Sequence, residues 1–497
     1  MSRQKYGRWW PWLVVGIVVI TLGIPVYATV RGQSARPTVT VTVNHSLIVG
    51  HSHFAPGITY TDNSLVYPWE NNDPTAIENA KSLMSSAVKF QNTPIMAGGL
   101  PDLWPDPSTN EPTNWGALDQ RLQLIVSTRG VPVITLNAAP WWMMGQLQSD
   151  GTTLLLTRSD EWDERAYASR ILDDQMDGWL HLVKRVAERY MASPYNVRYF
   201  QVWNGLNGYY NPRADDYDYS TSAGNPAGSN ATHGYTYMYN RVFDTLTTVA
   251  TSLGIPQTEL KVGGPSPQVN TWSSRVQSKP SSLKKSYGRF DQRPLDAIKY
   301  WLQNKQGASF ITVDANNTNL DNINRASASD AAAKFADIVR WIRSLDNRDY
   351  PGATSLPIWL GQWYARPFKD WSNNNHCNAI ETYAMMEFMK AGGAVALDGG
   401  ESDVNRGESR LWTDTVKGGG AALPFYYSYR DFNLYFPAGT ALYKTTISTP
   451  AQVDALASAT VVMLVNRTSL TTVVHVDSTT QLLAPYEVAI VNLSALH

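Results

Sequence analysis

The chain has 497 residues, 43% of them hydrophobic, enough to bury one large core and a small accessory domain. Its 41 basic and 42 acidic residues give a formal net charge of −1, so we expect no nucleic-acid partner. The single cysteine, Cys377, excludes an internal disulfide, and the 18 tryptophans and 26 tyrosines supply aromatic faces of the kind that stack on sugar rings.

Residues 1–31 are predicted to be an export signal. Basic residues precede Trp9–Val30, an uncharged run long enough to span a bilayer with its basic end inside. We favour an uncleaved membrane anchor, although Val26–Ala28 has the character of a cleavage site. Either outcome predicts an extracytoplasmic protein, anchored at the cell surface or secreted.

Residues 32–44 are predicted to be a linker followed by one strand, Thr38–Val43, whose side chains alternate strictly. From residue 45 to residue 435, strand-like and helix-like segments take turns. The eight predicted strands are Leu47–Gly50, Pro94–Gly98, Pro132–Asn137, Arg198–Asn204, Leu260–Gly264, Phe310–Asp314, Pro357–Gln362 and Ala394–Asp398.

Three segments between these strands carry apolar stripes with the 3.6-residue period of a helix, around residues 172–190, 238–253 and 335–345. Eight strands that alternate with helices predict an α/β fold, a (β/α)8 TIM barrel with long loops. A doubly wound open sheet competes, but no glycine-rich phosphate turn follows the first strand. Residues 436–497 become short strands and predict a small C-terminal β-sandwich, completed by Thr38–Val43.

The fourth and seventh predicted strands end on unusual residues. The fourth ends at Trp203-Asn204-Gly205, and the seventh ends at Leu360-Gly361-Gln362. Retaining glycosidases need two carboxylates, one as acid/base and one as nucleophile, and a barrel supplies them from the C-terminal ends of two strands on opposite sides of its mouth. Both strand ends have the surroundings of such a site without the acid.

The chain resembles the clan of retaining (β/α)8 glycoside hydrolases, and most closely the β-xylosidase/α-L-iduronidase-like family 39. Besides strands four and seven, the resemblance rests on Lys261–Pro265, Leu411–Thr415 and Leu483–Val491. It implies that Asn204 holds a sugar 2-hydroxyl, that Gly205 occupies the acid/base position and that Gln362 occupies the nucleophile position. Both catalytic glutamates would then be substituted, and binding of a poly- or oligosaccharide without cleavage is the expected function.

Further residues near the predicted strand ends are candidates for substrate binding. The candidate aromatic platforms are Trp141, Trp142, Trp203, Trp363, Tyr364 and Trp412. The candidate replacement acids are Asp314, Asp398 and Glu401, with loop closure or helix capping as their alternative role. His51 and His53 follow the predicted first strand, where a histidine would bond a ligand or a neighbouring loop. With His45, which precedes the strand, their spacing matches no common metal site, and we expect no metal and no cofactor.

Two other functions stay open from the sequence. One is an active glycosidase or transglycosidase that uses displaced carboxylates. The other is a barrel that scaffolds an envelope assembly. An engineered inactive variant would also carry glutamine at the nucleophile position, whereas glycine at the acid/base position is a less usual replacement. The glycan and the oligomeric state do not follow from the sequence.

Overall fold

The computed structural model describes residues 36–59, 65–66, 72–96, 103–160, 164–224, 232–273, 277–399 and 411–493. The chain divides into two units, Met1–Arg36 and Pro37–His497, and the architecture below belongs to the second. The predicted export signal, residues 1–31, lies outside the described residues. Among the residues that are described, no helix is long and apolar enough to cross a membrane.

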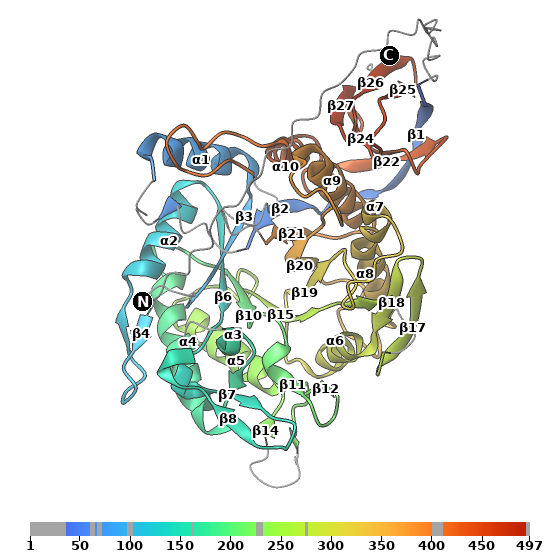
Figure 1. The fold of residues 1–497 in the computed structure, drawn as a ribbon. Helices are drawn as coiled ribbons and strands as arrows, with labels where there is room; N and C mark the ends of the chain where they lie inside the picture. The colour runs from blue at the N-terminus through green and yellow to red at the C-terminus, as the bar shows by residue number, and fades with distance from the viewer. Residues whose placement is uncertain are drawn as a thin grey trace, which may run out of the picture. The chain divides into compact units, whose positions relative to one another are not determined.

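Eight parallel strands close into a barrel, as the alternation of strands and helices predicted (Figure 1). Each strand pairs with the next one along the chain, and the last pairs with the first. In chain order they are β2 (Ala55–Ile58), β3 (Phe90–Pro94), β6 (Val131–Leu136), β10 (Tyr199–Val202), β15 (Lys261–Gln268), β19 (Phe310–Asn316), β20 (Ile358–Tyr364) and β21 (Val395–Asp398).

The first two barrel strands differ from the predicted ones. Leu47–Gly50 belongs instead to the end of β1 (Thr38–His51), which pairs with the C-terminal sheet, so the first barrel strand is β2. The apolar run Leu47–Val49 suggested a buried strand, but each of these side chains is about half exposed. The second barrel strand, β3, precedes the predicted Pro94–Gly98, because its buried positions include the polar Gln91–Thr93, which hide the expected apolar pattern.

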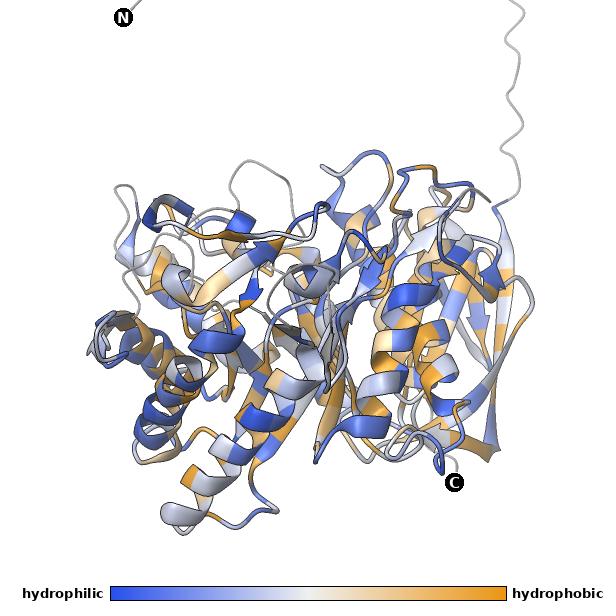
Figure 2. Ribbon diagram, turned by 90° about the horizontal axis from the view of Figure 1, so that it is seen from below, coloured by the Kyte–Doolittle hydropathy of each residue, from blue (hydrophilic) through white to orange (hydrophobic). Residues whose placement is uncertain are grey.

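A helix follows each barrel strand. They are α1 (Pro74–Ala87), α2 (Gly116–Ser127), α4 (Met176–Met191), α5 (Tyr235–Ser252), α6 (Gln292–Asn304), α8 (Lys334–Arg343), α9 (Asn374–Lys390) and α10 (Pro424–Tyr435). The three predicted apolar stripes are confirmed as the buried faces of α4, α5 and α8. Figure 2 shows hydrophobic and hydrophilic bands along single helices, which fits helices packed on one side only.

Aromatic rings fill the N-terminal half of the barrel interior. Phe90, Tyr199, Phe310 and Trp359 come from the first or second residue of four strands. Phe310 stacks on Trp359 with 4.1 Å between ring centroids, and Trp359 lies 5.0 Å from Phe90 and 5.7 Å from Tyr199. Since inward positions recur every second residue, the next inward layer lies nearer the C-terminal ends of the strands.

That next layer is polar. Asn92 accepts a hydrogen bond from Thr135 at 2.8 Å and donates to Thr59 at 3.0 Å, all three being buried. Gln201 and Thr312 are the corresponding inward positions of β10 and β19 and are also buried. The barrel interior therefore has an aromatic layer in its N-terminal half and a polar layer nearer the C-terminal ends of the strands. The polar layer lies directly beneath the C-terminal face, where barrel proteins place their sites.

The C-terminal strands form one sheet with β1. Its order is β26 (Thr479–Leu483), β25 (Thr472–Val476), β1, β22 (Ala441–Ile447), β23 (Val453–Ala457), β24 (Val461–Asn466) and β27 (Val488–Asn492). The predicted role of Thr38–Val43 is confirmed, since β1 pairs with β22 and β25. The strands of the predicted β-sandwich are paired as one continuous sheet, which encloses a single apolar cluster drawn from nearly all of its strands.

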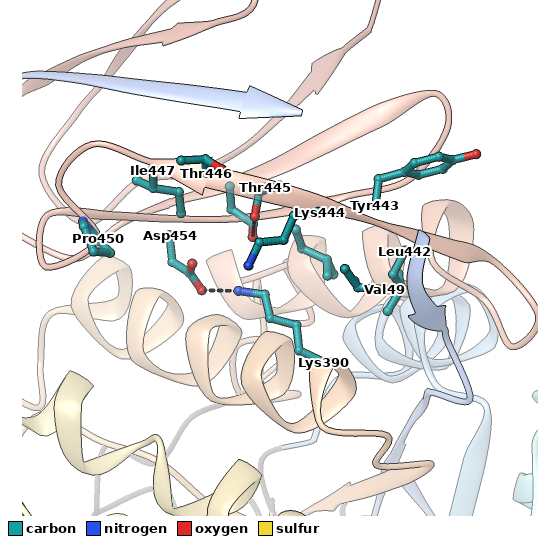
Figure 3. A pocket seen from close by; sticks show the side chains of 12 residues that line it. Val49, Lys390, Leu442, Tyr443, Lys444, Thr445, Thr446, Ile447, Pro450 and Asp454 are labelled. Carbon is teal, nitrogen blue, oxygen red and sulfur yellow. Dashed lines mark hydrogen bonds and ion pairs between the residues drawn. The ribbon is translucent and has the colours of Figure 1, made fainter. Parts of the chain in front are cut away.

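One face of α9 holds this sheet to the barrel. His376, Tyr383 and Lys390 are spaced by seven residues, so they lie along one side of the helix. The His376 ring stacks on Tyr486 at 3.9 Å, and the Tyr383 ring lies 4.1 Å from the guanidinium carbon of Arg467. Lys390 Nζ pairs with Asp454 Oδ2 at 2.7 Å, which Figure 3 shows as the contact that closes the lower side of a cavity of about 470 Å³.

The ion pair of Lys390 with Asp454 is expected to stabilise the junction. Its side chains are 24% and 10% exposed, so Lys390→Ala would leave a largely buried carboxylate without its ammonium partner. We expect a loss of about 2–3 kcal/mol in the free energy of unfolding, less than the cost of breaking a fully buried pair. Urea denaturation would measure it.

The matched control is Lys81→Ala, which breaks the exposed pair of Lys81 with Glu78 on α1. That pair should contribute less than about 1 kcal/mol. Equal losses in the two variants would show that the junction does not depend on Lys390.

Candidate functional site

The C-terminal end of β10 has a strained backbone. Trp203 follows the strand with φ +68°, and Gly205 has φ +69°. A bulky residue in this left-handed region costs about 1–2 kcal/mol, and such strain collects at functional sites. Asn204 lies between them and is half-buried at the barrel mouth.

Gly205 leaves open space where an acid would project. A Cβ atom built on Gly205 would meet no heavy atom within 4 Å. Crowding around the Cβ position therefore does not explain the missing side chain, although any residue other than glycine would be strained at this positive φ.

Gln362 lies on a bulge in β20. The pairing with β19 runs from Val313–Leu360 directly to Asp314–Gln362 and skips Gly361. A Cβ on Gly399, just after β21, would lie 3.3 Å from Gln362 Cγ and 3.4 Å from its Nε2, so the half-buried Gln362 side chain lies against the end of β21. A bulge re-aims a side chain, and here it sets the direction of the amide at the predicted nucleophile position.

Below Gln362 lies a chain of buried polar groups. Gln201 Nε2 donates to Ser266 Oγ at 3.3 Å, and Ser266 Oγ donates to Asp314 Oδ1 at 3.0 Å. A Cβ on Gly361 would lie 3.0 Å from both Asp314 Oδ1 and Gln201 Oε1, so these two oxygens converge on the bulge. Burial raises the pKa of Asp314 to about 7, against the hydrogen bonds from Ser266 and the Gln362 backbone that lower it.

This cluster includes residues that the sequence did not single out. Ser266 was missed because the predicted fifth strand ended at Gly264, while β15 continues to Gln268 through a bulge in its pairing with β19. Gln201 and Asn137 were missed because each was taken as an ordinary strand residue. Within the part of the chain that the structure describes, Gln201 Oε1 and both amide atoms of Asn137 are buried without a hydrogen-bond partner, as expected for groups that bind water. These residues could have been found from the sequence by looking for polar residues at the last inward-facing positions of the predicted strands.

Three predicted aromatic platforms are corrected. Trp203 and Trp363 are 0% and 1% exposed, and Trp412 is 8% exposed. Trp203 packs on Trp179 of α4 at 5.8 Å, and Trp363 packs on Phe335 of α8 at 5.3 Å. Both rings fill the layer between barrel and helices, where no sugar can reach them.

Tyr364 remains a candidate at the end of β20. It is half-buried, and its hydroxyl accepts a hydrogen bond from Asn316 Nδ2 at 3.2 Å. The guanidinium carbon of Arg366 lies 4.8 Å from the Tyr364 ring and 5.8 Å from the ring of Trp371, which is 48% exposed in the following loop. Trp371 is thus a second exposed ring on this side of the mouth.

Trp141 and Trp142 lie on the opposite side, after β6. They form the short 3₁₀ helix η2 (Trp141–Met143), are half-buried, and meet edge to face with 5.6 Å between centroids. Since β6 and β20 are four strands apart around an eight-stranded barrel, aromatic side chains border two opposite sides of the mouth.

The predicted positions of His51 and His53 are wrong. Both side chains are exposed and precede β2, so they lie at the N-terminal end of the barrel, away from the mouth. The error follows from taking Leu47–Gly50 as the first barrel strand. His45 Nε2 lies 3.7 Å from Asp477 of the C-terminal sheet.

Two carboxylates occur in the eight described barrel strands, Asp314 and Asp398. Asp398 ends β21 and is 2% exposed, and its backbone oxygen accepts from Thr59 N at 2.9 Å. Glu401 lies outside the described residues. Among those that are described, no group of three or more His, Cys, Asp or Glu side chains could hold a metal ion.

Solved structures with a similar fold were found, whereas no protein-family model and no curated protein matches the sequence. SrfJ from Salmonella typhimurium is 10% identical with a TM-score of 0.56, covering 94% of each chain. A glucosidase from Croceicoccus marinus is 12% identical with a TM-score of 0.51, covering 93% of this chain and 85% of its own. The endo-β1,6-glucanase BT3312 is 10% identical with a TM-score of 0.50, covering 90% and 91%.

Family 39 glycoside hydrolases, the family that the sequence resembles, are also among the similar structures, with TM-scores of 0.48 to 0.49. The closed eight-stranded barrel is thus a (β/α)8 fold, which the glucosidase and the endo-β1,6-glucanase share. At these identities the likeness shows the fold alone.

The raised pKa of Asp314 predicts a pH dependence of stability. Its folded-state pKa of about 7 lies above the ordinary value of 3.8, so the folded protein holds this proton more tightly than the unfolded chain. This contribution to stability is complete below about pH 4 and is lost as the pH rises to about 7. Asp314→Asn removes the titration, so relative to the wild type the variant should gain up to about 1.4 kcal/mol per pH unit over this range.

Urea denaturation at pH 5 and pH 7.5 would measure this difference, with Asp174→Asn, at an exposed carboxyl before α4, as the control. A difference between Asp314→Asn and the wild type that does not change with pH would contradict the raised pKa.

Proposed function

We propose that this chain binds a poly- or oligosaccharide at the barrel mouth and does not cleave it. The observation that carries the proposal is the pair of residues at the ends of β10 and β20, Gly205 and Gln362, in a mouth that is otherwise built as a site. Retaining glycoside hydrolysis needs carboxylates about 5–5.5 Å apart on the two sides of the scissile bond. Glycine has no proton to donate, and a neutral amide can neither form the glycosyl ester nor stabilise the developing positive charge.

Several features support retention of binding. The space at Gly205 is open, Asn204 is half-buried beside it, and the bulge in β20 still directs a hydrogen-bonding amide to the mouth. Tyr364 and the pair Trp141–Trp142 add aromatic surface at opposite sides. Two of the similar structures are named a glucosidase and an endo-β1,6-glucanase, and these names fit a carbohydrate ligand for this fold.

Residues 1–31 support a place of action outside the cytoplasm. Their basic start and apolar run support export and a membrane tether, which would present the barrel outside the cytoplasm. A glycan of the cell surface or its surroundings would then be the ligand.

A second candidate function, slow hydrolysis, is favoured by the burial of Asp314, which raises the pKa of its carboxyl to about 7. A carboxyl that is half protonated at neutral pH has the property of a general acid. A nucleophile or base would also be needed, and Asp398, the other carboxyl of the barrel strands, is almost fully buried. Binding without cleavage is therefore the function that these residues support best.

The test is restoration of the two acids. Residues 32–497 of the wild type should bind a glycan on an array with saturation and release no reducing ends from it. The double variant Gly205→Glu/Gln362→Glu should hydrolyse the same glycan, because both carboxylates return to strand ends that can accept them. Either single variant should stay at least about a hundredfold slower than the double variant, since each lacks one of the two groups.

Three results would overturn the proposal. They are turnover by the wild type that is lost in Asp314→Asn, no binding to any glycan on a broad array, and a folded double variant that binds but does not hydrolyse. The last result would show that strands β10 and β20 do not carry the acid positions.

A further inference from the structure

A cavity of about 370 Å³ opens between the loops that follow β3 and β6. Its walls come from three segments far apart in the sequence, and the lining residues are Pro105, Asp106, Pro107, Thr113, Trp141, Trp142 and Arg158. Loops after barrel strands lie on the C-terminal face, so this cavity shares the face of the mouth. Trp141 is five residues beyond the end of β6, which limits its distance from that strand end to about 18 Å.

The loops around the cavity are held in place by their own polar contacts. Asp106 Oδ1 accepts hydrogen bonds from Ser108 N at 2.7 Å and Ser108 Oγ at 2.6 Å, and this turn closes the hairpin of β4 (Leu103–Pro105) with β5 (Pro112–Asn114). Trp142 Nε1 donates to Asn110 Oδ1 at 3.4 Å, which ties the indole to the same hairpin.

The third wall is fixed by Asp160. This buried carboxylate accepts from Thr157 N at 2.8 Å and Oγ1 at 2.7 Å, and it pairs with Arg165 at 2.9 Å. These bonds shape the short helix that begins at Arg158. The cavity is thus formed in advance of any ligand, which lowers the entropy cost of binding.

The cavity is lined by both a hydrogen-bond acceptor and hydrogen-bond donors. Asp106 carries an acceptor, and its pKa is held below the ordinary value by the hydrogen bonds from Ser108, so it is ionised at neutral pH. Arg158 carries hydrogen-bond donors, and its side chain is exposed. Two half-buried indoles lie beside this acceptor and this donor.

We infer that this cavity is a second sugar subsite at the rim of the barrel mouth, in addition to the position between Gly205 and Gln362, and that it takes a neutral pyranose unit of an oligosaccharide. A pyranose with equatorial hydroxyls presents axial C–H groups to an indole face and hydroxyls at its edge. Those hydroxyls can donate to Asp106 and accept from Arg158. A uronate or sulfated unit would place its negative charge beside the Asp106 carboxylate, which disfavours it.

The inference rests on the proposed function, because it places a second part of the same glycan. Its consequence is a dependence on chain length: a short ligand fills either the mouth or the cavity, and a longer one fills both. The second contact is then intramolecular and raises the overall affinity. The ligand class is an oligosaccharide of several neutral units.

The test uses the full-length protein in detergent and a ladder of neutral β-linked gluco-oligosaccharides of increasing length, with binding followed by calorimetry and tryptophan fluorescence. The affinity of the wild type should rise with length. Trp141→Ala should remove this rise and weaken binding of the longest ligand about tenfold, as expected for one stacked ring. Binding of the shortest ligand should change less.

Arg158→Ala keeps the inference testable if Trp141→Ala disturbs folding, since the Arg158 side chain is exposed. This substitution should lower the affinity for the longest ligand by about five- to tenfold. The matched control is Tyr427→Ala, which removes an exposed aromatic ring from α10, outside the cavity.

The outcomes separate the two claims. If the wild type binds no glycan at all, the proposed function fails. If it binds the ladder but Trp141→Ala and Arg158→Ala bind every length like the wild type, only the subsite is wrong. A preference for uronate-containing over neutral ligands that Arg158→Ala abolishes would contradict the neutral class.

Discussion

The stacked contact of Phe310 with Trp359, with Phe90 and Tyr199 around it, decides what the rest of the barrel interior can be. These rings fill the N-terminal half of the closed barrel, so the interior is a packed core and not a channel. Because strand side chains alternate, the next inward positions are one layer higher, and they are polar. Asn92, Gln201 and Thr312 therefore form a polar layer directly beneath the side chains at the C-terminal ends of the strands.

The described barrel strands carry this polar layer, and neither β10 nor β20 ends in a carboxylate. Asp314 lies buried beside Gln362, and a glutamate at position 362 would put a second carboxyl next to one that already holds its proton to about pH 7. Two neighbouring carboxyls resist ionisation together. The neutral amide of Gln362 adds no charge beside the Asp314 carboxyl. Gly205 likewise relaxes a backbone with positive φ.

The amino-acid pattern correctly predicted the elements whose apolar residues are the buried ones. The stripes of α4, α5 and α8 have one apolar face, and β19, β20 and β21 are apolar runs of ordinary length, so these were found. The first two strands were missed for opposite reasons: Leu47–Val49 is apolar but exposed, whereas Gln91–Thr93 is polar but buried. Hydropathy alone predicts neither case, because the burial of each strand depends on the strands that pair with it, and these lie far away in the sequence.

The ends of the fourth and seventh barrel strands were predictable, but the directions of the side chains there were not. The ends of β10 and β20 were identified, yet Trp203 and Trp363, directly beside them, proved to be core residues, because a tryptophan at a strand end can point either to the mouth or to the surrounding helices. Ser266 and the bulge at Gly361 depend on pairing between strands and leave no mark in the sequence.

The most direct measurement is a crystal structure of residues 32–497 soaked with a neutral oligosaccharide that the protein binds. The account predicts an uncleaved chain in the mouth, with an intact glycosidic bond between Gly205 and Gln362 and a sugar 2-hydroxyl on Asn204. A cleaved ligand, or a sugar joined to Asp314 or any other side chain, would contradict it.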